Sequence, residues 1–430
     1  MSKPLQIGLV GFGNIGSGVV RHLAEYGETI NGRLPRPLKL KTICDVDLET
    51  DRGVSTQGIT LTSNYLDIIG DPEIEVVIEL IGGTKIANTI VTEALKAGKH
   101  VVTANKALIA TYGGDLFRTA EEGGAHLLFE ASVGAGIPLI RSLQAGLQPN
   151  KFNVLHGILN GTCNYILSAM EERRGVEFKT VLEEAMRLGY AEPDPTLDIE
   201  GVDTGHKIAV LGSLIFGQDL RIDDVDLMGI TRLSPTEVDF AAAHGQTIKL
   251  LATASRDENG TPRLSVWPTL VPLDHPIGRV RGVTNTLWVD AEPVGPVMMT
   301  GAGAGQGSTS SGVLSDVCLV AQAGDVETLR RLNPLTTASG AARAKQVPVQ
   351  HPLRYLRVEA EDKTAVRKAL ADLKVLGEDV RGVSFVAPVQ SEEERATMLA
   401  KIQAAGIAAN SICELRVGLQ DPATVLGKEG

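Results

Sequence analysis

The chain has 430 residues, of which 43% are hydrophobic and 22% charged, and its formal net charge is −11. This composition indicates a soluble globular protein of two or three domains, and the negative charge disfavours nucleic-acid and acidic-membrane partners. We find no apolar run long enough for a transmembrane helix and no room for a signal peptide. The four cysteines are scattered without a C-x-x-C pair. We therefore expect a cytoplasmic protein without disulfides or a zinc site.

A dinucleotide-binding turn is predicted at the start of the chain. Residues 5–10 have the apolar, β-branched pattern of a short buried strand, and GFGNIG follows before a helical pattern begins. Gly11, Gly13 and Gly16 fit G-x-G-x-x-G. The first two glycines allow a tight turn and close approach of the pyrophosphate, and the third lets the helix pack on the strand. The alternative is a glycine-rich turn in some other α/β sheet.

Two aspartates follow the second predicted strand, which lies within residues 38–47. An acidic residue there can hydrogen-bond the ribose hydroxyls of NAD and would repel the 2′-phosphate of NADP. Asp45 and Asp47 occupy this position with Val46 between them, and Arg52 lies just beyond. The pattern favours NAD.

A lysine follows the fourth predicted strand. Strands are predicted at residues 75–81 and at HVVTA, with a helix over residues 86–97 between them. Lys106 stands just past the second of these strands, at the edge where open α/β sheets bind ligands. The alternative is a solvated lysine, although a cation at a helix start is slightly unfavourable.

A glycine-rich turn carries a candidate cation site. HLLFEASVGAGIP places Glu130 at the end of an apolar strand, and the turn exposes the carbonyls of Val133, Ala135 and Ile137. One carboxylate with several carbonyls can hold a hard cation, because such ions prefer oxygen ligands. Spacing alone nevertheless favours a plain turn.

The segment from Leu188 to Gly217 is the strongest catalytic candidate. Prolines keep its first half in an extended loop. That half is acidic and contains Glu192, Asp194, Asp198, Glu200 and Asp203. Lys207 then enters an apolar helix and, four residues after Asp203, shares a helix face with it. A lysine that enters a buried helix beneath several carboxylates is placed to exchange protons. The alternative is a surface ion pair worth about 0.3–0.5 kcal/mol.

The rest of the chain indicates two further domains. Residues 248–296 have strand patterns with polar turns, typical of a mainly antiparallel sheet with one exposed face. A glycine loop then feeds a helix that we expect to return to the nucleotide domain, with Gly303 and Gly305 near the cofactor. Residues 328–350 resemble a linker. The residues after it have the βαββαβ order of a ferredoxin-like fold, and its first helix is expected over residues 363–377.

The predicted fold is therefore α/β with three domains. They are a Rossmann nucleotide-binding domain of residues 1–130 plus about 305–335, an α+β substrate and dimerisation domain of residues 131–304, and a C-terminal ferredoxin-like domain of residues 350–430.

These segments together resemble the homoserine dehydrogenase family along essentially the whole chain. The motifs that carry the resemblance are GFGNIG, TANKALIATYG, FEASVGAGIP, GILNGTCNYIL and GYAEPDPTLDIEGVDTGHK, of which the last is the most specific. The resemblance implies reversible reduction of L-aspartate 4-semialdehyde to L-homoserine with NAD or NADP, in the biosynthesis of threonine, methionine and isoleucine. It also implies a homodimer or homotetramer.

The resemblance assigns roles to individual residues. It makes Lys207 the proton donor and acceptor and places Lys106 and Asp203 beside it in catalysis. Glu192 is matched to the carboxylate that binds the substrate ammonium, with Tyr190, Asp198, Asp203 and Thr162 around it. The implied cofactor contacts, beside the three glycines of the turn, are Phe12, Asn14, Ile15, Thr84, Thr103 and Lys106. Glu130, Val133, Ala135 and Ile137 match a structural sodium site.

The chain departs from the family in two places. Its C-terminal module resembles a regulatory ACT domain, but Thr364-Ala365 stands where such domains usually have Pro-Gly, which argues against threonine inhibition. Val46 stands where the family often has an arginine, which argues against a preference for NADP. Two other functions stay open. One is a dehydrogenase of another small amino-acid-like carbonyl compound. The other is a dinucleotide-sensing regulatory protein, which would need no proton donor such as Lys207.

Overall fold

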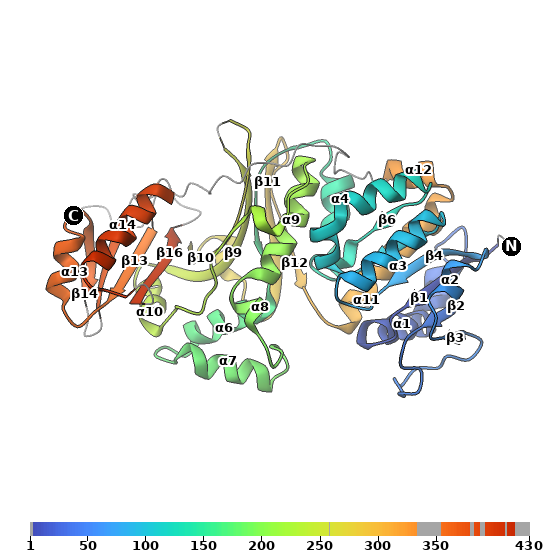
Figure 1. Ribbon diagram of the computed structural model, residues 1–430, viewed down its shortest axis with the longest axis horizontal. Helices are drawn as coiled ribbons and strands as arrows, with labels where there is room; N and C mark the ends of the chain where they lie inside the picture. The colour runs from blue at the N-terminus through green and yellow to red at the C-terminus, as the bar shows by residue number, and fades with distance from the viewer. Residues whose placement is uncertain are drawn as a thin grey trace. The chain divides into compact units, whose positions relative to one another are not determined.

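The chain forms two compact units (Figure 1). The computed structural model describes residues 3–257, 259–332, 354–378, 382–387, 392–408 and 411–417. Unit 1 comprises residues 1–154, 206–224 and 286–345, and unit 2 comprises residues 155–205, 225–285 and 346–430. The chain passes from one unit to the other within β7 (Lys151–Ile158), α9 (Val202–Phe216) and β11 (Thr284–Glu292). Among the described residues, no helix has both the length and the apolar character that a membrane span needs.

Unit 1 contains a six-stranded parallel sheet with strand order β3-β2-β1-β4-β5-β6. Its strands are β1 (Leu5–Val10), β2 (Leu38–Cys44), β3 (Thr60–Thr62), β4 (Ile74–Glu79), β5 (His100–Thr103) and β6 (Leu127–Leu128). The central strands are apolar at nearly every position because both faces of a parallel sheet are covered. The strand order reverses between β1 and β4, and open α/β sheets bind dinucleotides at such a point.

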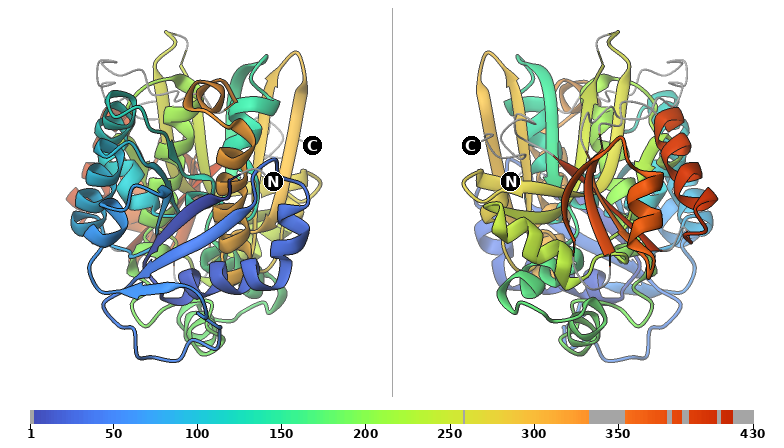
Figure 2. Two further views of the ribbon diagram at one scale, coloured as in Figure 1. Left: turned by 90° about the vertical axis from the view of Figure 1, so that its right-hand side faces the viewer. Right: turned by 90° about the vertical axis from the view of Figure 1, so that its left-hand side faces the viewer.

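Helices cover both faces of this sheet. Figure 2 (left) shows α3 (Lys85–Lys96) and α4 (Lys106–Glu122) on one side of the blue strands, and α1 (Asn14–Asn31) and the orange α11 (Gln306–Ala323) on the other. Helices α1 and α11 share one hydrophobic core with β1, β2, β4 and β5. The other elements of unit 1 are α2 (Leu66–Ile69), η1 (Glu130–Ser132), α5 (Leu139–Arg141), η2 (Ser142–Gly146), η3 (Ile222–Asp224), β12 (Gly295–Ala302) and α12 (Val326–Leu332).

Unit 2 is built on a mixed sheet. Strands β9 (Gln246–Arg256) and β10 (Pro262–Pro272) form a long antiparallel ladder, and β8 (Val225–Leu227) pairs with β10 in parallel. Helices α6 and α10 pack against β9. The unit's helices are α6 (Gly161–Glu172), α7 (Phe178–Arg187), α8 (Thr196–Ile199), α10 (Pro235–Ala243) and η4 (Pro276–Arg279). Both β9 and β10 are buried along almost their whole length, so the predicted exposed face is absent from these two strands, whereas β11 and β12 keep partly exposed positions.

The C-terminal part of unit 2 has the predicted βαββαβ order. Its elements are β13 (Arg354–Glu359), α13 (Lys363–Ala369), β14 (Lys374–Glu378), β15 (Gly382–Ala387), α14 (Glu392–Ala404) and β16 (Ile412–Val417). The antiparallel strand order is β16-β13-β15-β14, and residues of both helices join one core with the strands. Figure 2 (right) shows these strands in red with α13 and α14 on one face. Strand β16 also pairs with β10 in parallel, which joins this module to the rest of the unit 2 sheet.

Two predicted boundaries are wrong. Residues 374–377, expected at the end of a helix, belong to β14, because pairing with β15 overrides the local helical pattern. The first residues of the expected linker form α12 instead: Asp325 accepts the N–H of Thr328 at 2.8 Å, and Leu329 packs into the unit 1 core. The remainder of that linker lies outside the described residues.

Candidate functional site

The glycine turn has the backbone geometry that a dinucleotide requires. Gly11 has a φ of 100°, and a Cβ there would lie 2.6 Å from the backbone of Leu80. A Cβ on Gly16 would lie 2.1 Å from the carbonyl oxygen of Gly11, whereas a Cβ on Gly13 would meet nothing within 4 Å. Gly11 and Gly16 therefore let strand and helix meet, and Gly13 leaves an open face toward which a pyrophosphate can approach. The turn fits a dinucleotide.

The first turn of α1 is held by the first residue of α11. Gln306 donates from Nε2 to the carbonyl oxygen of Asn14 at 2.7 Å and to its side-chain oxygen at 3.0 Å. Ile15 follows Asn14 in the same turn, and Gly303 and Gly305 form the loop directly before Gln306. Gln306 could not be identified from the sequence, because its partner lies nearly 300 residues earlier in the chain.

The end of β2 carries both acidic and basic groups. The Asp45 carboxylate accepts the N–H of Phe12 at 2.5 Å and that of Asp47 at 2.9 Å. The guanidinium of Arg52 lies 5.0 Å from the centroid of the Phe12 ring and 3.3 Å from the Asp47 carboxylate. Arg52 therefore reaches back to the strand end, which its position in the sequence did not establish. Val46 is 95% exposed.

The loops after β4 and β5 bring three predicted cofactor residues to one edge of the sheet. Gly82 and Gly83 have φ values of 74° and 67°, and Thr84 follows as the N-cap residue of α3. Thr103 is the fully buried last residue of β5, and Lys106 is the half-buried first residue of α4. Because β4 and β5 are adjacent and parallel, both loops leave the same edge.

In unit 2, Asn160 brings two predicted carboxylates together. Its Nδ2 donates to Asp198 Oδ1 at 2.7 Å and lies 3.1 Å from Asp203 Oδ2. Its Oδ1 accepts the N–H of Cys163 at 2.8 Å and so caps α6. The three segments that meet here are the turn before α6, the short helix α8 and the start of α9. In the sequence Asn160 is only one residue of the GILNGTCNYIL motif, and its connecting role follows from the fold.

Two other predicted substrate residues are exposed. Glu192 lies on the loop between α7 and α8, and Tyr190 is 44% exposed. The carbonyl of Tyr190 accepts the hydroxyl of Thr162 at 2.5 Å, and its ring packs on Tyr165 with centroids 4.8 Å apart. Thr162 thereby links the first turn of α6 to the loop that carries Glu192.

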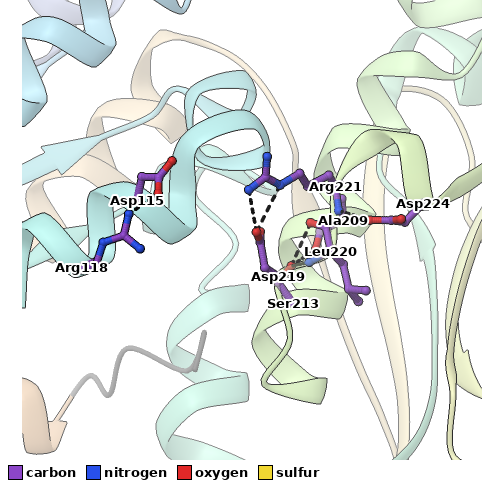
Figure 3. Close-up of polar contacts among 8 residues, drawn as sticks. All are labelled: Asp115, Arg118, Ala209, Ser213, Asp219, Leu220, Arg221 and Asp224. Carbon is purple, nitrogen blue, oxygen red and sulfur yellow. Dashed lines mark hydrogen bonds and ion pairs between the residues drawn. The ribbon is translucent and has the colours of Figure 1, made fainter. Parts of the chain in front are cut away.

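Helix α9 carries the predicted catalytic lysine. Lys207 is 9% exposed, and Asp203 lies one turn earlier on the same helix. The end of the helix is held by its own following loop (Figure 3): Ser213 Oγ donates to the Ala209 carbonyl at 2.8 Å and accepts the Leu220 N–H at 3.0 Å. The helix is therefore fixed beyond the lysine, as the positioning of a proton-transfer group requires.

The predicted sodium loop is fixed by a buried carboxylate. Glu130 accepts the N–H groups of Ile140 at 2.9 Å and Arg141 at 2.8 Å, and its own N–H donates to Asp316 at 2.8 Å. Burial and the nearby Asp316 carboxylate raise the pKa of Glu130. Each carboxylate oxygen of Glu130 accepts one backbone N–H group and keeps a further lone pair, so the carboxylate can still contribute to a cation site beside the main-chain carbonyls of the loop. Among the described residues no cluster of three His, Cys, Asp or Glu side chains could hold a metal.

A pocket lies between α4 and the second half of α9 in unit 1. Its lining is mostly apolar and includes Ile109, Phe117 and Val210. Asp219, on its wall, pairs with Arg221 at 2.7 Å (Figure 3). None of the predicted catalytic, substrate or cofactor residues lines this pocket. The predicted residues instead lie in two polar groups, one at the sheet edge of unit 1 and one in the acidic segment of unit 2.

Comparison with known proteins agrees with this geometry. Residues 138–318 match a family model described as homoserine dehydrogenase, and residues 11–130 match one described as the NAD-binding domain of homoserine dehydrogenase. A homoserine dehydrogenase from Pseudomonas aeruginosa is 39% identical over 395 residues, which cover 91% of this chain and 89% of that protein. One from Bacillus subtilis is 39% identical over 74% of this chain and 73% of its own.

Solved structures show the same relationship. A homoserine dehydrogenase from Thiobacillus denitrificans superposes with a TM-score of 0.88 at 36% identity, covering 96% of this chain and 98% of that one. A hyperthermophilic archaeal homoserine dehydrogenase, solved in complex with NADPH, superposes with a TM-score of 0.61 at 25% identity, covering 74% of this chain and 97% of that one. The Pseudomonas aeruginosa and Thiobacillus denitrificans proteins match 91% and 96% of this chain at 39% and 36% identity. The chain therefore belongs to the homoserine dehydrogenase family.

Proposed function

We propose that this NAD(P)-dependent oxidoreductase interconverts L-homoserine and L-aspartate 4-semialdehyde with Lys207 as the group that exchanges the substrate's hydroxyl proton. The observation that carries the proposal is the place of Lys207: a buried amine in α9, one helical turn after an aspartate that Asn160 joins to a second carboxylate. A substrate with an ammonium group and a reacting oxygen needs this combination of charges.

The residues divide the work by charge. When homoserine is oxidised, a neutral Lys207 amine accepts the hydroxyl proton. In the reverse direction its ammonium stabilises negative charge on the aldehyde oxygen and then donates the proton. Bound NAD(P) supplies hydride exchange with the carbon. Lys106, at the start of α4, is assigned to the same edge as the cofactor and adds a second positive charge there.

We assign the substrate ammonium to the acidic segment. Glu192 is the first partner, with Asp198 and Asp203 beside it. Each of these aspartates takes one hydrogen bond from Asn160 and keeps further acceptor capacity, because an ionised carboxylate has about four lone-pair sites. Thr162 and Tyr190 complete the set by fixing the loop that carries Glu192.

The cofactor contacts are assigned to the glycine turn, to Thr84, Thr103 and Lys106, and to the loop of Gly303 and Gly305. We propose that NAD is accepted at least as well as NADP, since Asp45 and Asp47 stand where a 2′-phosphate would lie. Arg52 opposes this preference, because its guanidinium lies at the same strand end.

Three further assignments rest on the family resemblance. The carbonyls of Val133, Ala135 and Ile137, with residue Glu130, would hold a structural sodium ion. The module after residue 350 is proposed to be an ACT-like domain that supports assembly of a homodimer or homotetramer more than threonine inhibition. Among the described strands β14 lies at the end of the sheet, and such an edge can pair with another copy. We also propose that the enzyme works in the cytoplasm.

An initial-rate assay tests the function directly. Homoserine oxidation is followed with NAD and with NADP, with and without threonine, beside a panel of other small amino-acid alcohols. Homoserine should be the preferred substrate by at least about tenfold in kcat/KM, because an analogue with a shorter or longer chain between its ammonium and its hydroxyl misplaces the reacting group. A higher kcat/KM for another amino-acid alcohol would contradict homoserine as the substrate but would leave the proposed hydride and proton exchange unchanged.

A further inference from the structure

A buried carboxylate stands at the cofactor edge of unit 1 without a role in the function described above. Glu79 is the last residue of β4 and is 0% exposed. It lies at the carboxyl end of the strand, beside the point where the strand order reverses. A charged group is costly to bury unless hydrogen bonds compensate it, so its partners indicate why it is there.

Donors from two loops converge on this carboxylate. Thr103, at the end of β5, donates its hydroxyl to Glu79 Oε2 at 2.7 Å, and the N–H of Ile81 donates to Oε1 at 2.9 Å. The pKa of Glu79 is raised overall, because burial outweighs the hydrogen bonds from Thr103, Ile81, Asn105 and Gly82, which lower it. These donors favour the ionised carboxylate, which accepts hydrogen bonds only.

The hydrogen bonds continue from Thr103 into the helix that carries Lys106. Thr103 Oγ1 accepts the N–H of Asn105 at 2.9 Å. The side chain of Asn105 then accepts the N–H of Leu108 at 3.0 Å, which caps α4, and donates to the carbonyl of Gly83 at 2.6 Å. Glu79 is therefore the common acceptor that ties the Gly82-Gly83-Thr84 loop to the loop that starts α4.

The strand order says which half of a dinucleotide these loops face. The glycine turn after β1 receives the pyrophosphate, and the acidic end of β2 lies beside the adenosine ribose. Strands β4 and β5 lie on the other side of β1, so the loops joined by Glu79 face the nicotinamide half.

We propose that Glu79 is a positioning residue for the nicotinamide half of the cofactor, acting through Thr103 and Asn105 on the two loops and on the first turn of α4. The proposal rests on the proposed function only in that the chain binds NAD(P). Glu79 does not itself exchange a proton or a hydride. It holds Thr84, Thr103 and Lys106 in the arrangement that receives the reacting ring.

The alternative explanation is that the Glu79 carboxylate merely supports the fold. The two explanations predict weaker binding of different ligands when Glu79 is changed. Glu79→Gln replaces one acceptor oxygen with an NH₂ donor, so either the Thr103 hydroxyl or the Ile81 N–H loses its acceptor. Positioning of the nicotinamide half should weaken, whereas the glycine turn and the β2 end make no contact with Glu79 among the hydrogen bonds described above. A general loss of folding would instead weaken every ligand together.

The test is calorimetric titration of the full-length protein with NADH and with ADP-ribose, which lacks the nicotinamide. For Glu79→Gln we expect the Kd for NADH to rise about tenfold, the loss of a hydrogen bond to a charged group. The Kd for ADP-ribose should stay within about twofold of the unmodified protein. Asn105→Asp, which keeps the cap on α4 but loses the donor to the Gly83 carbonyl, should give the same selective loss and decides the matter if Glu79→Gln does not fold.

Glu75→Gln is the matched control. Glu75 lies on the same strand β4 but pairs with Arg36 at 2.6 Å on the surface, so this variant should bind both ligands normally. Equal weakening of NADH and ADP-ribose, or no change in either, would overturn the proposal. Because binding is measured without homoserine, the result is independent of the substrate assignment: a protein that binds NADH but does not oxidise homoserine would contradict the proposed function alone.

Discussion

The glycine turn of unit 1 and the acidic cluster of unit 2 are organised in different ways. The turn is determined by main-chain space within six consecutive residues, where Gly11 and Gly16 sit so close that a Cβ on one would overlap the carbonyl of the other. The cluster is determined by side chains from three separate segments that Asn160 draws together. A backbone constraint can be recognised from sequence, whereas side-chain convergence depends on how the chain folds.

The largest effect we expect comes from removing the proton-exchanging amine. Lys207→Ala should lower kcat at least about a hundredfold, the lower range for a general acid–base group, and leave the Kd for NADH nearly unchanged. Steady-state rates and cofactor titration measure both. Lys179→Ala, an exposed lysine of α7, is the matched control and should keep its activity. A near-normal rate for Lys207→Ala would remove the lysine from the mechanism.

Adding one methyl group at Gly16 tests whether the glycine turn depends on main-chain space. Gly16→Ala places a Cβ 2.1 Å from the Gly11 carbonyl oxygen, so the turn must shift and the Kd for NADH should rise about thirtyfold, with a loss of stability of about 2 kcal/mol. The control is Gly27→Ala on the same helix α1, where a Cβ meets nothing within 4 Å. That change should stabilise the protein by about 0.5–1 kcal/mol.

If Gly16→Ala bound NADH normally, the turn would be a packing feature rather than a phosphate cradle. Thermal melts and calorimetric titrations of the two variants separate the effect on stability from the effect on binding.

The same contrast explains what the sequence could and could not predict. The parallel sheet, the glycine turn and the βαββαβ module follow from local patterns of apolar residues and glycines, and all three are present. Gln306, Asn160 and Glu79 escaped attention because each acts on a partner from a distant segment. Residues 374–377 were assigned to a helix because a strand that gains its stability from pairing with β15 carries no reliable local signal.

A substitution of Glu192 tests the acidic cluster of unit 2, and we expect a smaller effect from it. Its contact with the substrate ammonium would exist in the ground state and in the transition state alike, so Glu192→Gln should raise the KM for homoserine about tenfold and change kcat little. Asp194→Gln, on the same loop, should behave normally, because its carboxylate accepts hydrogen bonds from Thr196. An unaltered KM for Glu192→Gln would mean that the substrate ammonium binds Asp198 or Asp203, which Asn160 holds, instead of Glu192.

The smallest effect concerns the choice between NAD and NADP, where backbone and side chains act together. Arg52 donates to the carbonyls of Asp47 and Thr50, each at 2.7 Å, and lies over Phe12 of the glycine turn. Without it, Asp45 and Asp47 would meet a 2′-phosphate unopposed. We expect Arg52→Ala to lower kcat/KM with NADP about fivefold more than with NAD, a modest change because the guanidinium is already engaged by two carbonyls and by the Asp47 carboxylate.

This fivefold difference between NADP and NAD should become smaller at high salt, since screening weakens both the attraction of Arg52 and the repulsion of Asp45 and Asp47 for the 2′-phosphate. Lys41→Ala is the control: Lys41 lies in β2 but is paired with Asp71 and Glu73, each at 2.6 Å, so its removal should not change the cofactor ratio. An equal loss with both cofactors for Arg52→Ala would mean that Arg52 only braces its own loop. If the unmodified enzyme were at least about tenfold more efficient with NADP, Arg52 would outweigh the two aspartates and the NAD assignment would fail.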